Sequence, residues 1–228
     1  MLAIVDSSIP DPVPAGLAAA IAVAAVEAGG VVQLIGKVGD DPDGDAAVLA
    51  LGRAGVGHAA MLRDAGHRTP VVRVTATSGG DGGALAVDGD DDSAHLATRL
   101  PGDVEPDDRS GRPTLDAADV ELALRYLPDV RVVALVEPLD GLITVAVAEA
   151  AAAGAHLTVV LASDAVSGGP PLDELPAGAL VLAAPQGGDA AMFALLVGRY
   201  LAAVDAGADP AKAFGAVMAA LSGDRATG

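Results

Sequence analysis

Apolar residues along the chain alternate between short compact runs and longer stretches with helical spacing. The compact runs predict buried strands at residues 2–5, 31–35, 130–136, 157–161 and 180–183. The longer stretches predict helices at residues 16–28, 45–54, 116–127, 142–153, 189–206 and 210–221. Because strands separated by helices pair in parallel through right-handed crossovers, the pattern predicts an α/β fold with a mostly parallel sheet flanked by helices.

One region departs from this alternation. Residues 71–77 and 84–87 have strand-like composition and are joined by a glycine-rich stretch. They predict a hairpin within residues 69–90 that lies outside the main sheet as a small lid. Residues 101–113 are rich in proline, glycine and acidic residues, which predicts a flexible loop. No repeat divides the chain, so we expect a single domain over residues 1–228.

Charge and composition exclude several classes of function. The 228 residues include 31 acidic and 13 basic ones, and the resulting net charge of −18 repels nucleic acids and anionic membranes. The absence of cysteine excludes disulfides, thiolate metal sites and a cysteine nucleophile. The longest apolar stretches are far shorter than the roughly 20 residues of a membrane span, and the first residues lack the basic charge of a signal peptide. These features predict a cytoplasmic protein.

The segment GKVGDDPDG at residues 36–44 is the most distinctive in the chain. It follows a predicted strand and opens a helix, where α/β sheets place their binding crevices. Its glycine spacing is not that of a phosphate-binding P-loop, and the sixth position of a potential calcium loop is Ala46 rather than glycine. A turn with helix-capping aspartates is the alternative explanation without a ligand.

Residues 31–56 resemble the N-terminal signature of ribokinase-like (PfkB-type) carbohydrate kinases, G-x-V-G-x-D-x-x-G, with Gly36, Gly39, Asp41 and Gly44 at the matching positions. The lid hairpin and the strand–helix units at 130–161 also fit the family, so the resemblance covers nearly the whole chain. It implies a ribokinase-like three-layer sandwich with a small β lid.

The resemblance also implies a sugar-like ligand, with ATP and Mg²⁺ as cofactors. Gly16, Gly39 and Asp41 are then substrate-binding residues, and Asp11 is the carboxylate that holds sugar hydroxyls. Two family positions depart from the pattern: Ala15 stands in place of the first glycine of a Gly-Gly pair, and Ala20 stands where the family has an asparagine that contacts the sugar. An alanine side chain neither donates nor accepts a hydrogen bond. The family is also noticeably longer than this chain.

The segment APQGGD at residues 184–189 admits two alignments with the family. In one, Gln186 and Asp189 replace the asparagine and glutamate that order metal and phosphate. In the other, Gly187 and Gly188 form the anion cradle and Asp189 is the catalytic base. The third alternative is a tight turn in which Asp189 only caps the following helix.

These observations predict a PfkB-type homologue that is catalytically degenerate and retained for small-molecule binding or assembly. The alternative is an active sugar or nucleoside kinase with Asp189 as base. The hairpin at 69–90 is apolar on at least one face, and two strands alone cannot bury such a face. Together with the resemblance, this predicts a homodimer through the lid hairpin.

Overall fold

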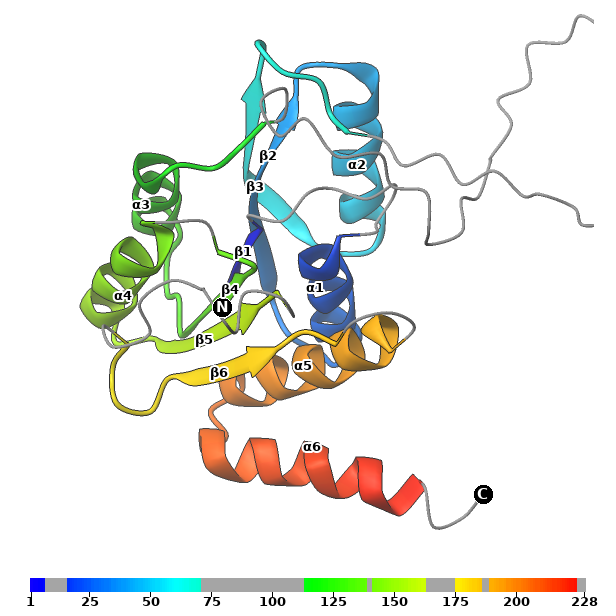
Figure 1. Ribbon diagram of the computed structural model, residues 1–228, viewed down its shortest axis with the longest axis vertical. Coiled ribbons are helices and arrows are strands. Elements are labelled where there is room, and N and C mark those ends of the chain that lie inside the picture. Colours follow the sequence, from blue (N-terminus) through cyan, green and yellow to red (C-terminus); the bar gives the residue numbers. More distant parts are fainter. Residues whose placement is uncertain (7–15, 71–112, 139–140, 163–174, 186–188, 225–228) are drawn as a thin grey trace, which may run out of the picture.

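A six-stranded parallel sheet forms the centre of the molecule in the computed structural model, which describes residues 1–6, 16–70, 113–138, 141–162, 175–185 and 189–224 (Figure 1). The strands are β1 (Leu2–Asp6), β2 (Val32–Gly39), β3 (Gly57–Asp64), β4 (Val132–Val136), β5 (His156–Leu161) and β6 (Leu180–Ala183). Their spatial order is β3-β2-β1-β4-β5-β6, and every neighbouring pair is parallel.

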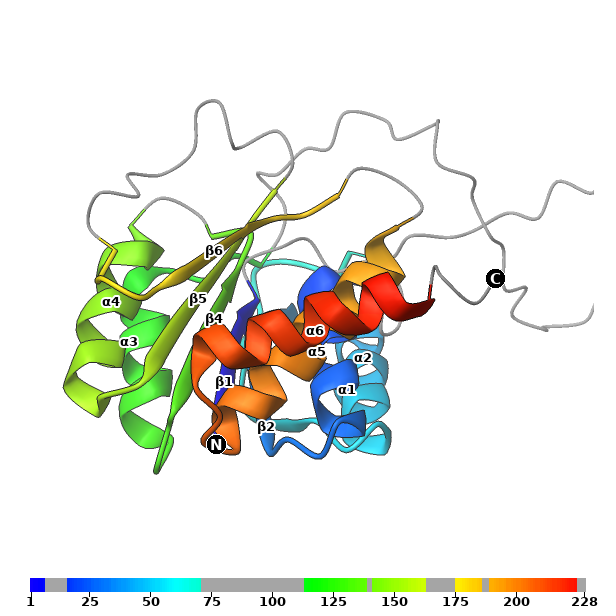
Figure 2. The ribbon, with the colours of Figure 1, turned by 90° about the horizontal axis from the view of Figure 1, so that it is seen from below.

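Helices cover both faces of this sheet. They are α1 (Leu17–Glu27), α2 (Pro42–Arg53), α3 (Ala117–Tyr126), α4 (Leu142–Ala153), α5 (Ala190–Asp205) and α6 (Pro210–Asp224). Helices α3 and α4 lie on one face, α1, α2 and α5 lie on the other, and α6 packs on the outer side of α5 (Figures 1 and 2). The predicted α/β fold with a parallel sheet between helix layers is therefore confirmed.

The core has two parts because successive residues of a strand point to opposite faces of the sheet. Leu2, Ile4 and Leu34 belong to the cluster under α1 and α5. Ala3 and Val5 belong to the cluster under α3 and α4. Strands buried on both faces need apolar residues at nearly every position, which is why the sequence shows them as compact runs.

Every strand and helix predicted within the described residues is present, but two features differ from the expectation. Strand β2 continues to Gly39, so the first half of the segment 36–44 is strand rather than turn. Strand β3 was not predicted at all, because only Ala60 of its residues is buried at this edge of the sheet. Residues 71–90 of the predicted lid and residues 101–112 of the predicted acidic loop lie outside the described residues.

Within the described part of the chain, no helix has the length and apolar composition needed to cross a membrane.

Candidate functional site

The strand order reverses direction between β1 and β4, which creates the topological switch point of the sheet. Open parallel sheets bind their ligands at such a point, beyond the carboxyl ends of the strands. Asp6 ends β1 and lies in register with Val136, the last residue of β4. Glu137 follows directly after Val136. Two carboxylate residues therefore end the two strands that flank the switch point.

Glu137 has a left-handed backbone conformation, with φ of +47°. Its amide donates a hydrogen bond of 2.7 Å to the carbonyl oxygen of Val160 on the neighbouring strand β5. A left-handed conformation costs a non-glycine residue about 1 kcal/mol or more, and such residues gather at functional sites. Sequence reasoning missed Glu137, although an acidic residue directly after a fully buried strand is a signal that could have identified it.

Helix α5 brings Asp189 to the same edge of the sheet. The helix packs along α1 and over β1 and β4, so its N-terminus opens beside the N-terminus of α1 (Figure 2). The Asp189 carbonyl oxygen accepts from the amide of Phe193, but the side chain makes no capping hydrogen bond and is exposed. The exposed carboxylate does not perform the helix-capping role that was one of the three alternatives. Gln186, Gly187 and Gly188 lie outside the described residues.

The glycine–aspartate motif joins three separate segments. Asp41 is the N-cap of α2, where one carboxylate oxygen accepts from the Gly44 amide at 2.8 Å. The other oxygen accepts from the Thr69 amide at 2.7 Å, beyond the end of β3. The Gly39 amide in turn donates to the Thr69 hydroxyl at 2.8 Å. The motif thus fastens the end of β2 and the start of α2 to the segment after β3.

Gly39 has no room for a side chain in this arrangement. A Cβ atom there would lie 2.5 Å from an Asp41 carboxylate oxygen and 2.6 Å from the Thr69 amide nitrogen. A Cβ atom at Gly44 would likewise meet the Gly39 carbonyl oxygen. The structure therefore gives Gly39 and Asp41 a role in local packing, and their predicted contacts with a substrate stay predictions.

The hydrogen bonds to Asp41 change its acidity. Burial raises the pKa of this carboxyl group, but the amides of Gly44 and Thr69 favour the ionised form more strongly and bring the pKa below its usual value.

Arg63 of β3 adds a further link between β3, the end of β2 and the start of α2. Its guanidinium donates to the Gly39 carbonyl oxygen at 3.2 Å and to the Asp45 carboxylate at 2.6 Å.

The side chain of Lys37, in the same motif, interacts with the helix layer on the opposite face of the sheet, the face covered by α3 and α4. Its ammonium group contacts the Asp119 carboxylate of α3 at 2.8 Å, and this hydrogen bond raises the pKa of Lys37. Asp119 also belongs to the capping box of α3 together with Asp116. Lys37 therefore anchors α3 to the carboxyl end of β2.

The predicted site residues fall into two groups along one edge of the sheet. Gly16 is the buried N-cap residue of α1, and Asp189 is the N-cap residue of α5, the helix that packs along α1. Gly39 and Asp41 lie at the junction of β2 and α2. Asp11 lies outside the described residues, among which no three acidic, histidine or cysteine side chains are close enough to hold a metal ion.

Comparison with known proteins agrees with this reading of the motif. The model of the pfkB carbohydrate kinase family matches residues 12–102, which include Gly16, Gly39 and Asp41. The resemblance to PfkB-type carbohydrate kinases is confirmed. No curated protein matches the chain by sequence. The fold also resembles a solved apo protein from E. coli, provisionally described as ribokinase II, with a TM-score of 0.56, 15% identity and coverage of 93% of this chain and 88% of that one.

Other solved sugar kinases match less closely and are longer. A fructokinase from Vibrio cholerae O395, solved with fructose, ADP and calcium, has a TM-score of 0.43 and 18% identity over 70% of this chain and 49% of its own length. An uncharacterized sugar kinase from Pyrococcus horikoshii, solved with ATP, has a TM-score of 0.47 and 15% identity over 88% of this chain and 61% of its own. This chain thus spans about half to three-fifths of the length of these kinases.

Proposed function

We propose that this PfkB-type chain binds a small polyhydroxylated molecule, a sugar or a nucleoside, in the crevice between the carboxyl ends of β1 and β4. The supporting observation is the placement of Asp6 and Glu137 at the switch point, with Glu137 in a left-handed conformation. Carboxylates accept hydrogen bonds from hydroxyl groups, and these charge-assisted bonds are stronger than bonds between neutral groups. A hydroxyl-rich ligand is therefore the chemistry that suits two carboxylate residues at neighbouring strand ends.

We also propose that phosphoryl transfer by this chain is lost or strongly reduced. Transfer requires metal-bridged phosphates, an anion cradle and a base in one arrangement. The segment 184–189 supplies either the metal-ordering motif or the cradle with its base, because one segment cannot align with both. Ala20 on α1 also replaces the asparagine through which the family contacts the sugar. Binding without efficient turnover is consistent with both features.

The binding proposal predicts a specific loss of affinity in Glu137→Gln. This variant keeps the size of the side chain and removes its charge, so affinity should fall about tenfold or more, the contribution of a charge-assisted hydrogen bond. Calorimetric titration with sugars and nucleosides measures it. Glu121→Gln on the outer face of α3 is the matched control and should bind as the wild type does. Equal affinity in Glu137→Gln and the control, or no binding by any member of the panel, contradicts the proposal.

The second candidate function is an active kinase, which the exposed Asp189 carboxylate at the N-terminus of α5 favours. In that case Asp189 accepts the proton of the attacking hydroxyl, while ATP supplies the phosphoryl group. Helix N-termini favour the negative charge of phosphates. ATP and Mg²⁺ remain predictions that depend on residues 186–189.

Release of ADP from ATP in the presence of Mg²⁺ and the same panel of acceptors separates the two functions. We expect no acceptor-dependent turnover. A rate of about 1 s⁻¹ or faster, in the usual range of enzymes, would establish the kinase if Asp189→Asn abolishes it. Asp43→Asn, in the exposed first turn of α2, is the control that should leave any such rate unchanged.

A further inference from the structure

A group of polar side chains lies in the apolar layer between β5 and α5. His156 begins β5, and its Nε2 atom lies 2.8 Å from the hydroxyl oxygen of Tyr200 on α5. Tyr200 is 2% exposed, and its ring meets the imidazole edge-on with the centroids 6.2 Å apart. Thr158 follows on the same face of β5 and is fully buried, yet its hydroxyl group has no hydrogen-bond partner among the described residues. Because buried polar groups are normally paired, this hydroxyl group requires an explanation.

His156 is neutral at neutral pH. Burial lowers the pKa of its imidazole below the ordinary value of 6.5. The charged side chains described on and beside the elements around it are Arg131, Arg199, Asp205, Asp209 and Lys212. Asp205 is paired with Arg131 at 3.2 Å and with the Met1 amino group at 2.8 Å, Asp209 accepts from the Lys212 amide, and Arg199 and Lys212 line the groove between α5 and α6. Strand β6 contributes only apolar side chains, and α4 covers the other face of the sheet.

The protonation state of His156 decides where the Tyr200 proton points. A neutral imidazole accepts the proton of the Tyr200 hydroxyl group at Nε2, whereas an imidazolium has only donors. Once Nε2 carries a proton, the Tyr200 oxygen becomes the acceptor, and its own proton must turn to another oxygen. Burial raises the pKa of Tyr200, and the hydroxyl group of Thr158 is near enough to lower it in part. The unpartnered Thr158 oxygen is therefore placed to accept that proton.

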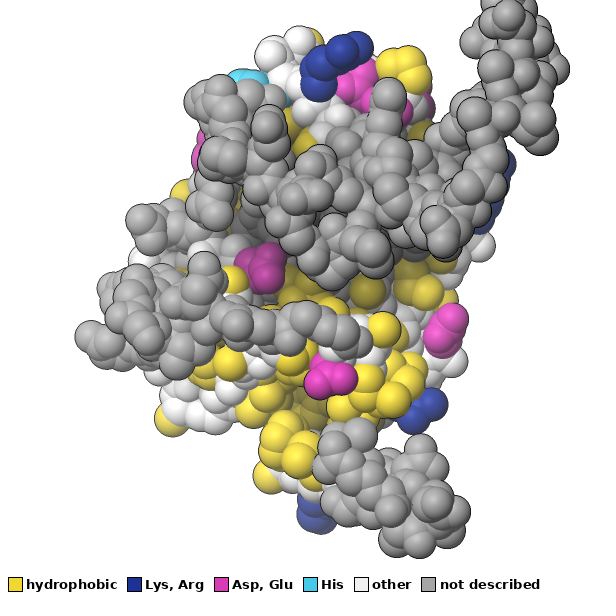
Figure 3. Space-filling view, turned by 45° about the vertical axis from the view of Figure 1, so that its right-hand side comes forward, with side chains coloured by type: hydrophobic (Ala, Val, Ile, Leu, Met, Phe, Trp, Pro, Cys, Tyr) yellow, Lys and Arg dark blue, Asp and Glu magenta, His cyan; other side chains and the backbone are white. Residues whose placement is uncertain are grey.

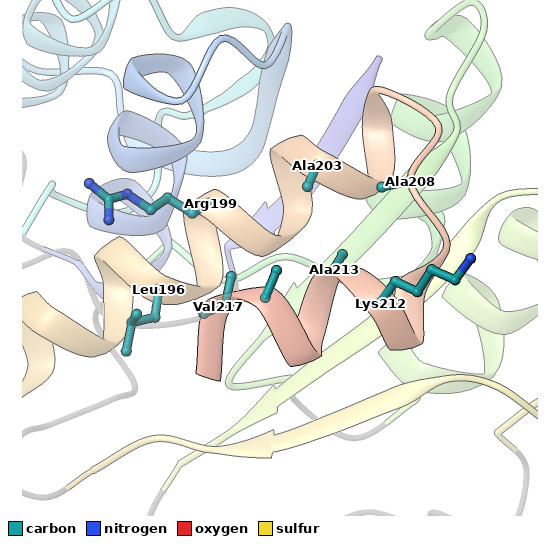
Figure 4. A pocket seen from close by; sticks show the side chains of 8 residues that line it. Leu196, Arg199, Ala203, Ala208, Lys212, Ala213 and Val217 are labelled. Carbon is teal, nitrogen blue, oxygen red and sulfur yellow. The ribbon is translucent and has the colours of Figure 1, made fainter. Parts of the chain in front are cut away.

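Helix α6 is attached to this group of side chains through Tyr200. The Phe214 ring of α6 meets the Tyr200 ring edge-on, with the centroids 6.3 Å apart. Of residues 210–219, whose side chains are described, only Ala213 is buried, and Phe214 is 37% exposed. A groove of about 370 Å³ runs between α6 and α5 (Figure 4), and Figure 3 shows hydrophobic side chains exposed at this end of the molecule. Elements with few buried contacts open locally at a lower free energy than the core does.

We propose that His156, Tyr200 and Thr158 form a two-position hydrogen-bond relay that weakens the docking of α6 when His156 takes up a proton. In the neutral position, Tyr200 donates to His156. In the protonated position, Nε2 of His156 donates to Tyr200, and Tyr200 donates to Thr158. The buried site solvates the imidazolium poorly, whereas undocking of α6 uncovers Tyr200 and admits water. Protonation therefore shifts the equilibrium toward undocked α6.

Hydrogen exchange of the full chain between about pH 5 and 7.5, corrected for the intrinsic exchange rates, tests the proposal. Because the pKa of His156 is lowered in the docked state, docking keeps its full stability above pH 6.5 and loses it as the pH falls toward the lowered pKa. We expect the opening equilibrium constant of α6 to be constant above pH 6.5 and to rise by up to about tenfold per pH unit below it. The amides of α6 should be less protected than those of β4 throughout. A pH-independent constant, or equal protection of α6 and β4 at every pH, overturns the proposal.

Two variants locate the effect in the relay. His156→Gln keeps an amide group near the position of Nε2 but does not titrate, so the pH dependence of α6 should disappear. His58→Gln, at an exposed position on β3, is the matched control and should keep it. Thr158→Val removes the second acceptor with little change of shape, so the affinity of His156 for a proton, measured by NMR titration, should fall about tenfold. An unchanged pH dependence in His156→Gln, or an unchanged titration of His156 in Thr158→Val, contradicts the relay.

Discussion

Replacing Gly198 with alanine is expected to lower the free energy of unfolding by about 3 kcal/mol, at the upper end of the usual cost of overpacking. Gly198 lies in α5 where this helix crosses α1. A Cβ atom there would lie 2.6 Å from the Ala24 Cβ and 2.7 Å from the Ala25 backbone nitrogen. Backbone atoms of a helix cannot rotate away as a flexible side chain can, so the two helices must separate.

Urea unfolding of Gly198→Ala and Gly215→Ala at the same protein concentration measures this effect. Gly215 also lies in a helix, but a Cβ atom there would have no neighbour within 4 Å. Alanine at that position should stabilise the chain by about 0.5–1 kcal/mol, because glycine is the poorer helix former. The two substitutions therefore have opposite expected signs. If the free energy of unfolding of Gly198→Ala equalled that of the wild type, α1 and α5 would not approach each other as closely as the structure shows.

The sequence predicted the secondary structure correctly where the burial of an element produces a recognisable pattern of apolar residues. Strands such as 132–136 are buried on both faces, so every residue is apolar and the run is conspicuous. Strand β3 lies at the edge of the sheet and exposes His58, Ala59 and Arg63. Its residues therefore show neither a compact apolar run nor clean alternation, and local reasoning could not recognise it.

The position of the switch point could not be predicted from the sequence for a different reason. It depends on the order of strands in the sheet, which crossovers between distant segments determine. Asp6 and Glu137 are 131 positions apart in the sequence, and only the pairing of β1 with β4 brings them to the ends of neighbouring strands. The motif at 36–44 was recognised from its spacing, but the partner of Asp41 is Thr69, 28 positions further on. Spacing alone does not identify such a partner.

Gly198 and Asp189 illustrate the same limit within α5. Its apolar spacing predicted the helix. The need for glycine at position 198 arises from the approach of α1, which is a property of tertiary packing. The packing of α5 along α1 also positions Asp189 beside the N-terminus of α1. The geometry of this part of the candidate site therefore depends on a helix–helix contact that cannot be predicted from the local sequence.

Asp41→Ala is expected to destabilise the chain by about 2 kcal/mol at neutral pH. The substitution removes the N-cap of α2 and leaves the amides of Gly44 and the buried Thr69 without their acceptor. Asp43→Ala is the control, because Asp43 lies in the exposed first turn of the same helix and only its interaction with the helix dipole is lost. That loss should stay below about 1 kcal/mol.

The effect of Asp41 should also depend on pH. The pKa of Asp41 in the folded chain is lower than the ordinary value of 3.8, because the bonds from Gly44 and Thr69 outweigh the effect of burial. A carboxyl group of this kind contributes its full stability above the unfolded pKa and loses it as the pH falls through the folded pKa. The stability difference between the wild type and Asp41→Ala should therefore be constant near neutrality and shrink below pH 3.8. Urea unfolding at a series of pH values measures this difference in the free energy of unfolding. A difference that stays constant below pH 3.8 would show that the charge of Asp41 does not hold these segments together. A loss of stability in Asp41→Ala no larger than that in Asp43→Ala would show the same.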